Sequence, residues 1–297
     1  MKNTNIILVV LVLTGLFSAC NGSGLTGRND KIDVIVSIPP QAELVKAIAK
    51  DKANVTSLTT SSVNPETYEP ALNSLIALEN SDIYMPVGTL GFESAMINRI
   101  NESGKSAVIS DMSTGIKLLY GTHEHHHDES DHHDHHHHGG ADPHIWSSPR
   151  NLSIMVDNIE RALSSVDEAN GDFYHENAVK LKNHIDSIDN AIKAVTDTLT
   201  CRTFIVWHPS LSYLANDYGL KQLVVGSHGK DMSVKQFHER LDKAVNENVR
   251  VFFFQQEFDS DNASEIQKRT GAQMITINPM NADWEKEFKL ITDGLRQ

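Results

Sequence analysis

Short apolar runs and stretches with helical spacing alternate along the N-terminal part of the chain. The run KIDVIVSIPP at 31–40 predicts a strand that ends in a turn, and the apolar positions Leu44, Val45, Ile48 and Ala49 predict the helix after it. The alternation continues with a strand at 54–59, a helix at 71–79, a strand at 82–87, a helix at 92–100 and a strand at 107–109. Repeated short strands and helices indicate a largely parallel sheet covered on both faces.

A second series of the same kind fills the C-terminal part. It consists of strands at 203–207, 220–225, 251–255 and 273–277, with helices at 211–218, 233–248 and 261–270 between them. This series predicts a second α/β lobe.

One long amphipathic segment separates the two series. Residues 174–199 contain no internal Gly or Pro, and their apolar positions recur every three or four residues. Such a segment predicts a single helix about 39 Å long, which would join the lobes rigidly. We therefore predict an α/β fold of two lobes, each a largely parallel sheet flanked by helices, with the N-terminal lobe at 31–173, the linking helix at 174–199 and the C-terminal lobe at 200–297.

Ten of the chain's sixteen histidines lie in the run HEHHHDESDHHDHHHH. Imidazole is the commonest protein ligand for transition metals, and the five interleaved acids add oxygen ligands. The run has no apolar residue, so we expect a disordered loop at 121–140 with many weak, exchangeable sites. The alternatives are a solvated acidic linker or a purification tag, although a tag would lie at a terminus and lack acids. The low-affinity ligands predicted in this loop are His123, His125, His126, His127, His132, His133, His135, His136, His137 and His138.

The first residues have the features of a targeting segment. An apolar run at 6–17, too short to span a membrane, precedes two small residues and then Cys20. This order resembles a bacterial lipobox, so we predict a signal peptide at 1–19, a lipidated Cys20 and a flexible Gly- and Asn-rich tether at 20–30. The alternative is a plain secretory signal cleaved nearby. The formal charge of −13 argues against a nucleic-acid partner, because phosphate binding needs clustered Lys and Arg.

Three loops lie where open α/β sheets place ligand sites. They are NPETYEP at 64–70, ADPHIWSSP at 141–149 and WHPSLSYLANDYGL at 207–220. His144 and His208 each adjoin a proline, which restricts the local backbone. Either histidine taken singly could be structural, but together with the His-rich run they indicate metal coordination.

This set of motifs resembles the periplasmic zinc- and manganese-binding proteins of ABC importers, the ZnuA-like group. The resemblance extends over 31–297 and implies two lobes joined by a rigid helix, with metal in the cleft between them. It also implies that His144 and His208 are metal ligands. The chain departs from the pattern at two positions, with Glu66 where the family usually has His and Asn278 where it often has Asp.

Elementary coordination chemistry permits a site with these departures. Two histidines and a carboxylate form a recognised zinc site, and the same set also binds iron(II) or manganese. The His-rich loop favours zinc, with manganese as the alternative. Glu66 could instead be an exposed acid paired with a nearby base. Asn278 offers a carbonyl oxygen as a weak fourth ligand or leaves that position to water. Of the remaining polar residues, Glu257 is expected to support the site or cap a helix. His228 is expected on the cleft side of the second lobe, most simply as a histidine of a surface loop.

The sequence therefore predicts a membrane-tethered, periplasmic or cell-surface receptor, not an enzyme, that captures zinc for an ABC-type metal permease. We expect a monomer. A manganese or iron(II) receptor of the same type is one alternative. A zinc hydrolase is another, but the chain lacks HExxH and GxSxG motifs. A metal-buffering or adhesive lipoprotein with no permease shares every ligand.

Overall fold

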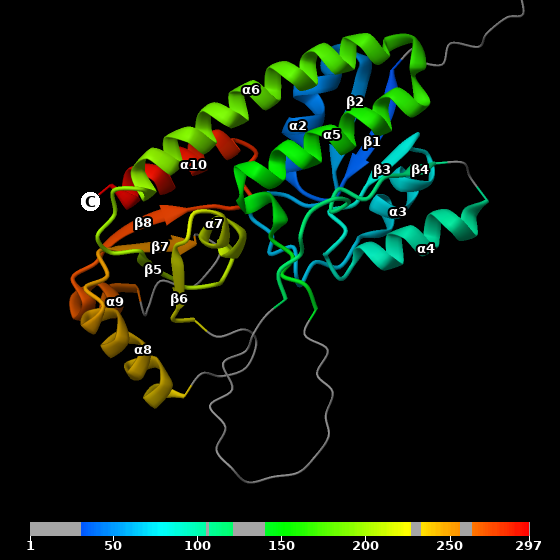
Figure 1. The fold of residues 1–297 in the computed structure, drawn as a ribbon. Helices are drawn as coiled ribbons and strands as arrows, with labels where there is room; N and C mark the ends of the chain where they lie inside the picture. The colour runs from blue at the N-terminus through cyan, green and yellow to red at the C-terminus, as the bar shows by residue number, and fades with distance from the viewer. Residues whose placement is uncertain (1–30, 105–106, 121–139, 227–232, 256–262, 297) are drawn as a thin grey trace, which may run out of the picture. The chain divides into compact units, whose positions relative to one another are not determined.

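The structure is a computed structural model that describes residues 31–104, 107–120, 140–226, 233–255 and 263–296. From Ile32 onward these residues form one compact unit. It contains two four-stranded parallel sheets of the same topology, which confirms the predicted α/β fold with two lobes (Figure 1). Cys20, the His-rich run, His228 and Glu257 lie outside the described residues, and their predicted roles stay predictions.

The N-terminal sheet has the strand order β2-β1-β3-β4. Its strands are β1 (Ile32–Val36), β2 (Ala53–Ser57), β3 (Ile83–Met85) and β4 (Val108–Ile109), and its helices are α2 (Pro39–Ala49), α3 (Leu72–Glu79), α4 (Glu93–Ser103) and α5 (Pro149–Val166). Val34 pairs with Val55 on one side and Ile83 on the other, so β1 is central. The prolines predicted to form a turn instead begin α2, because Pro is well tolerated in the first helical turn.

The C-terminal sheet repeats this arrangement in the order β6-β5-β7-β8. Its strands are β5 (Thr203–Val206), β6 (Lys221–Val224), β7 (Val251–Gln255) and β8 (Gln273–Ile277), and its helices are α7 (Ser212–Asp217), α8 (Val234–Asn246), α9 (Ala263–Thr270) and α10 (Trp284–Leu295). In β7, Phe253 faces a core shared with the other lobe, whereas Phe252 faces a smaller core within this lobe. This is the alternation that a strand buried on both faces produces.

The long linking helix is α6 (Gly171–Thr196), 26 residues in length. It begins and ends three residues earlier than the predicted 174–199. It packs against α2 and α5 of the N-terminal lobe and against α10 of the C-terminal lobe (Figure 1). Its buried side chains include Ile185 and Ile192, as the apolar periodicity predicts. None of the helices in the described ranges is both long and apolar enough to cross a membrane.

Two helices, α5 and α10, were not predicted. The 18-residue α5 begins after the cap residue Ser148, whose hydroxyl accepts a hydrogen bond from the Arg150 backbone N–H. Its buried face contains Leu152, Val156 and Ile159 at helical spacing. It packs along α6 as an antiparallel partner, and its first turn lies just after the loop that carries His144.

Candidate metal centre

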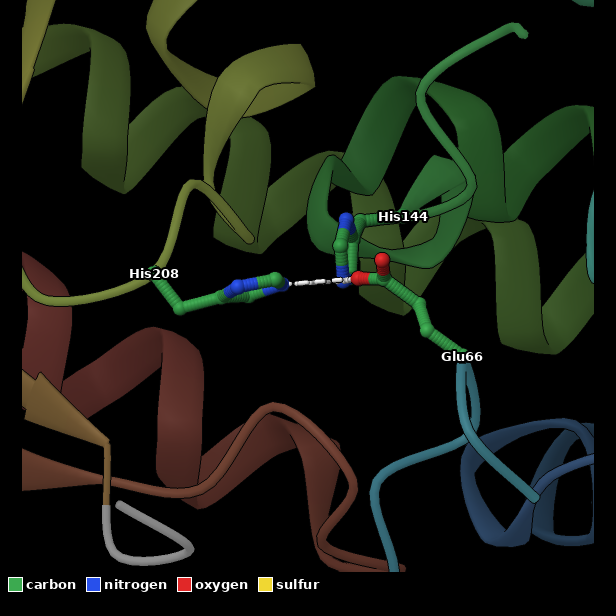
Figure 2. A group of neighbouring side chains, drawn as sticks. All are labelled: Glu66, His144 and His208. Atoms are coloured by element: carbon green, nitrogen blue, oxygen red, sulfur yellow. Dashed lines mark hydrogen bonds and ion pairs between the residues drawn. The ribbon is translucent and has the colours of Figure 1, made fainter. Parts of the chain in front are cut away.

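Three side chains from loops far apart in the sequence converge on one point. Glu66 lies in the loop after β2, and His208 follows β5, so both are at the carboxyl ends of parallel strands. His144 immediately precedes the short 3₁₀ turn at Ile145–Ser147 that leads into α5. Figure 2 shows all three pointing toward one another. They form the one cluster of three or more potential ligands found among the described residues.

The distances between their ligand atoms suit one metal ion. The Oε1 atom of Glu66 is 2.7 Å from His208 Nε2 and 3.2 Å from His144 Nε2, and the two Nε2 atoms are 3.4 Å apart. Ligands about 2.1 Å from a tetrahedral zinc ion lie about 3.4 Å from each other. Two of the three separations therefore need little change, and the shortest must open by several tenths of an ångström.

Asp142 holds His144 in the orientation that a metal ligand needs. Its Oδ1 atom lies 2.9 Å from both the backbone nitrogen and the Nδ1 atom of His144. When Nδ1–H donates to this carboxylate, Nε2 presents its lone pair to the other two side chains. The Trp146 ring lies 5.2 Å from the His144 ring and limits its movement. Asp142 was missed at the sequence level, although a carboxylate two residues before a candidate ligand is a readable signal.

Gln255 fixes the position of His208. This fully buried residue ends β7, next to β5 in the sheet. Its Oε1 accepts a hydrogen bond from the His208 backbone N–H at 3.2 Å, and its Nε2 donates to the His208 carbonyl and to Ser210 Oγ. The end of the neighbouring strand therefore sets the path of the loop that carries His208. Sequence reasoning missed this role as well.

A third support comes through the loop after β3. The buried Glu93 carboxylate accepts hydrogen bonds from the backbone N–H groups of Val87, Gly88 and Leu90 at 2.6, 2.8 and 3.1 Å. In the loop so held, Thr89 Oγ1 donates to the Pro143 carbonyl at 2.9 Å. The backbone of Pro143, which precedes His144, is therefore held in place by a loop of the N-terminal sheet.

The electrostatics of the site link the three side chains. Burial alone would raise the pKa of Glu66, but hydrogen bonds and positive charge from His144 and His208 hold it well below its usual range. Burial opposes protonation of His144, yet the Asp142 and Glu66 carboxylates outweigh it and raise its pKa to about 9. Without metal, a proton on His144 therefore partly neutralises the adjacent carboxylates. A bound dication would take over that role.

Asn278, the predicted fourth ligand, forms a different set of contacts. Its Nδ2 donates to the Ser61 carbonyl at 2.9 Å, and its Oδ1 accepts from the Met280 backbone N–H at 2.9 Å. The bond to Ser61 connects the segment after β8 to the loop that carries Glu66, and the bond to Met280 is local to that segment. A small cavity bordered by Trp146 and Met280 adjoins the two site histidines. Coordination by Asn278 stays a prediction, and water in this cavity is the alternative already named.

The fold and the site together define a class of protein: two parallel-sheet lobes joined by a long helix, with a candidate metal site of two histidines and a carboxylate. Residues 34–293 match the family model described as zinc-uptake complex component A, periplasmic, or ZnuA. The chain therefore belongs to this family, and the resemblance seen in its motifs is confirmed.

Individual relatives support the assignment to this family. The high-affinity zinc uptake system protein ZnuA of Bacillus subtilis (strain 168) is 29% identical over 272 residues, which are 89% of this chain and 85% of the relative. The zinc-binding lipoprotein AdcA of Streptococcus pneumoniae (strain ATCC BAA-255 / R6) is 24% identical over 97% of this chain, which spans 57% of AdcA. A solved structure described as the crystal structure of ZnuA matches with a TM-score of 0.79 at 27% identity, covering 90% of this chain and 98% of that one.

Proposed function

We propose that the protein is an extracytoplasmic receptor that binds one zinc ion at Glu66, His144 and His208 and delivers it to an ABC-type permease. The convergence of one carboxylate oxygen and two imidazole nitrogens from both lobes is the observation that carries this proposal. The relatives named as a zinc uptake protein and a zinc-binding lipoprotein support zinc as the cargo.

We infer that the site can both capture and release zinc, because one of its three side chains is accessible to solvent. The side chains of His144 and His208 are only 6% and 8% exposed, whereas the Glu66 side chain is 32% exposed. Glu66 is therefore the ligand that solvent reaches most easily, and we infer that zinc enters and leaves on its side. Its charge neutralises half of the dication, while the imidazoles supply the softer nitrogen ligands that favour zinc over manganese.

The proposal extends to the predicted anchor. With Cys20 lipidated and 20–30 as a tether, the folded unit would remain at the membrane surface near its permease. The lipoprotein relative supports this placement. The His-rich loop at 121–140 would collect zinc weakly and exchangeably. We propose a monomer, because one chain supplies all three ligands.

A receptor fits the site better than a hydrolase. Hydrolysis at zinc needs a free general base near the metal-bound water. Within the described ranges, no carboxylate besides Glu66 joins the ligand cluster, and Asp142 is engaged with His144. An assay with ester and phosphoester substrates, with and without zinc, tests this alternative. Metal-dependent turnover that His144→Ala abolishes would favour the enzyme.

The decisive experiment compares metals at the intact site. The mature protein is purified without chelators, and its metal content is measured by mass spectrometry. A variant lacking residues 123–138 is then titrated with zinc and with manganese, and His144→Ala in the same background is the control. We expect one tightly bound zinc, weaker manganese, and loss of tight binding in the control. Manganese as the bound metal, or tight zinc binding that survives His144→Ala, would overturn the proposal.

Transport is tested in cells. A strain lacking its own zinc receptor would receive this protein together with its candidate permease. Growth in zinc-depleted medium that depends on both is the expected result. Zinc binding without any effect on uptake would favour the metal-buffering lipoprotein.

A further inference from the structure

A second polar cluster, which shares no residue with the candidate metal centre, joins the two lobes. Arg150, in the first turn of α5, extends its guanidinium between α6 and the end of α7. Its Nε donates to Asp189 Oδ1 of α6 at 2.9 Å, and its Nη1 donates to the Asp217 carbonyl at 2.9 Å. The guanidinium also lies over the Tyr218 ring, 4.9 Å from its centroid. We call these four residues the Arg150 clasp.

Further contacts close the clasp into a ring. The Tyr218 hydroxyl donates to Asp189 Oδ1 at 2.6 Å, the atom that also accepts from Arg150. Ser148 Oγ donates to the Asp217 carboxylate. The Asp217 carbonyl lies at the C-terminal end of α7, where a cation is favoured by the unpaired helix carbonyls. Arg suits this position because its planar guanidinium group can donate to two acceptors and at the same time stack on an aromatic ring.

The clasp is close in sequence to both histidine ligands. Ser148 is four residues after His144, and the segment between them is the buried 3₁₀ turn Ile145–Ser147. Asp217 is nine residues after His208, and most of the connection is α7, whose Tyr213 and Leu214 are buried. Both connections are short and packed. A change in the distance between the first turn of α5 and the end of α7 would therefore move His144 relative to His208.

We propose that Arg150 is a positioning residue for zinc, which sets the separation of His144 and His208 by clasping the N-terminal lobe to α6 and α7. The proposal rests on the zinc site described above. Removing the guanidinium is expected to broaden the range of separations between the Nε2 atoms of His144 and His208, which are 3.4 Å apart in the structure.

The chain provides a matched control. Lys182 Nζ of α6 lies 2.6 and 2.8 Å from the two carboxylate oxygens of Asp157 on α5. This ion pair joins the same two helices as Arg150 and Asp189, but it does not reach the C-terminal lobe. Asp157→Asn should therefore perturb the α5–α6 contact without altering the separation of the histidines.

The test uses the mature protein lacking residues 123–138. Zinc affinity is measured by competition with a chromophoric chelator, and the visible spectrum of the cobalt(II)-loaded protein reports the ligand geometry. Arg150→Ala should weaken zinc binding by about tenfold, the lower end of the loss seen when groups that orient metal ligands are removed. It should also broaden or shift the cobalt bands. Arg150→Lys should recover only part of the affinity, because an ammonium group cannot bond both acceptors in the geometry of the planar guanidinium and stack on the ring. Asp157→Asn should leave both readouts unchanged.

Two outcomes would overturn the proposal: wild-type affinity and cobalt spectrum in Arg150→Ala, or an equal change in Asp157→Asn. If Arg150→Ala does not fold, Tyr218→Phe replaces it. That variant keeps the ring under Arg150 and removes only the bond to Asp189, so a wild-type cobalt spectrum there would also count against the clasp. A wild-type protein with no tight zinc site would instead refute the proposed function, so the two failures are distinguishable.

Discussion

Glu66 is the residue at which this chain departs most from the pattern of its family, and the structure places its carboxylate between two imidazoles. If it is a zinc ligand, Glu66→Ala leaves two histidines and a poorly neutralised dication. Zinc affinity should then fall by tenfold or more, taking the loss caused by removing supporting groups as a floor. Isothermal titration of the variant lacking residues 123–138 measures the change without interference from weak sites.

The matching substitution restores the usual family residue. Glu66→His should recover zinc binding and reduce any affinity for manganese, because a softer nitrogen replaces a hard oxygen. Unaltered zinc affinity in Glu66→Ala would show that this carboxylate only pairs with the histidines in the metal-free protein. His228 and Asn278 would then be the residues to test as third ligand.

His144 makes zinc binding dependent on pH. An isolated histidine loses its proton near pH 6.5, but Asp142 and Glu66 raise the pKa of His144 to about 9. Zinc binds the neutral ring, so each ion must displace one proton below that pH. Affinity should rise by about tenfold per pH unit between about pH 7 and 9. Calorimetry in buffers of different ionisation enthalpy should detect about one proton released per zinc at pH 7.5, and release of none would contradict the protonated state.

In the metal-free protein, the free energy of unfolding should fall as pH rises, whereas zinc affinity rises. A pKa raised in the folded state means that protonation of His144 stabilises the fold. This contribution is complete below pH of about 6.5 and is lost as pH rises through about 9. The lowered pKa of Glu66 gives a contribution that is present above pH of about 4.5 and lost in acid. Urea unfolding of the metal-free protein should therefore give a higher free energy of unfolding at pH 6 than at pH 9.

The candidate ligands were easier to predict from the sequence than the residues that orient them. Glu66, His144 and His208 stand in short motifs, and all three were named from the sequence. Asp142 was not, although it lies beside His144 in the same motif. Gln255 could not have been found by local reading, because its role depends on β7 lying next to β5. Strand neighbours are set by tertiary packing, which a local pattern does not encode.

At the scale of elements, the His-rich loop and the candidate metal site should bind zinc independently of each other. The loop offers ten histidines and five acids, whereas the candidate metal site offers three potential ligands, of which the two histidines are buried. Deleting residues 123–138 should lower the number of zinc ions bound by more than one and leave one tight site. Equilibrium dialysis with zinc measures both. Loss of the tight site on deletion would show that the cleft is not the high-affinity centre, and replacing the same residues with a Gly-Ser linker of equal length controls for chain length.

Helices with uninterrupted apolar spacing were easier to predict than those that depend on context. The 26-residue α6 was predicted with a shift of three residues at each end, because periodicity does not mark helix ends precisely. The missed α5 has a clear buried face, but its first residue, Pro149, belongs to the motif at 141–149 that was predicted to form a ligand loop. Its start at the Ser148 cap and Pro149 is a signal that sequence reading could have used.

At the scale of the whole molecule, the duplicated topology explains how side chains from both lobes meet at the candidate metal site. Each lobe presents a loop from the carboxyl edge of its sheet, β2 for Glu66 and β5 for His208. One hydrophobic core continues from β1 through α5 and α6 to Phe253 in β7. The lobes therefore share buried surface, and the loop positions are coupled through it.

This shared core predicts that the lobes unfold together and that zinc stabilises both. Differential scanning calorimetry of the protein lacking residues 123–138 should show one transition without metal. At free zinc about a hundredfold above the dissociation constant, the free energy of unfolding should rise by about 2.7 kcal/mol, so the single transition should move upward by several degrees. Glu66→Ala should reduce this shift at the same zinc concentration. Two separate transitions, or a zinc effect on only one of them, would mean that the lobes fold independently and that the metal is not held by both.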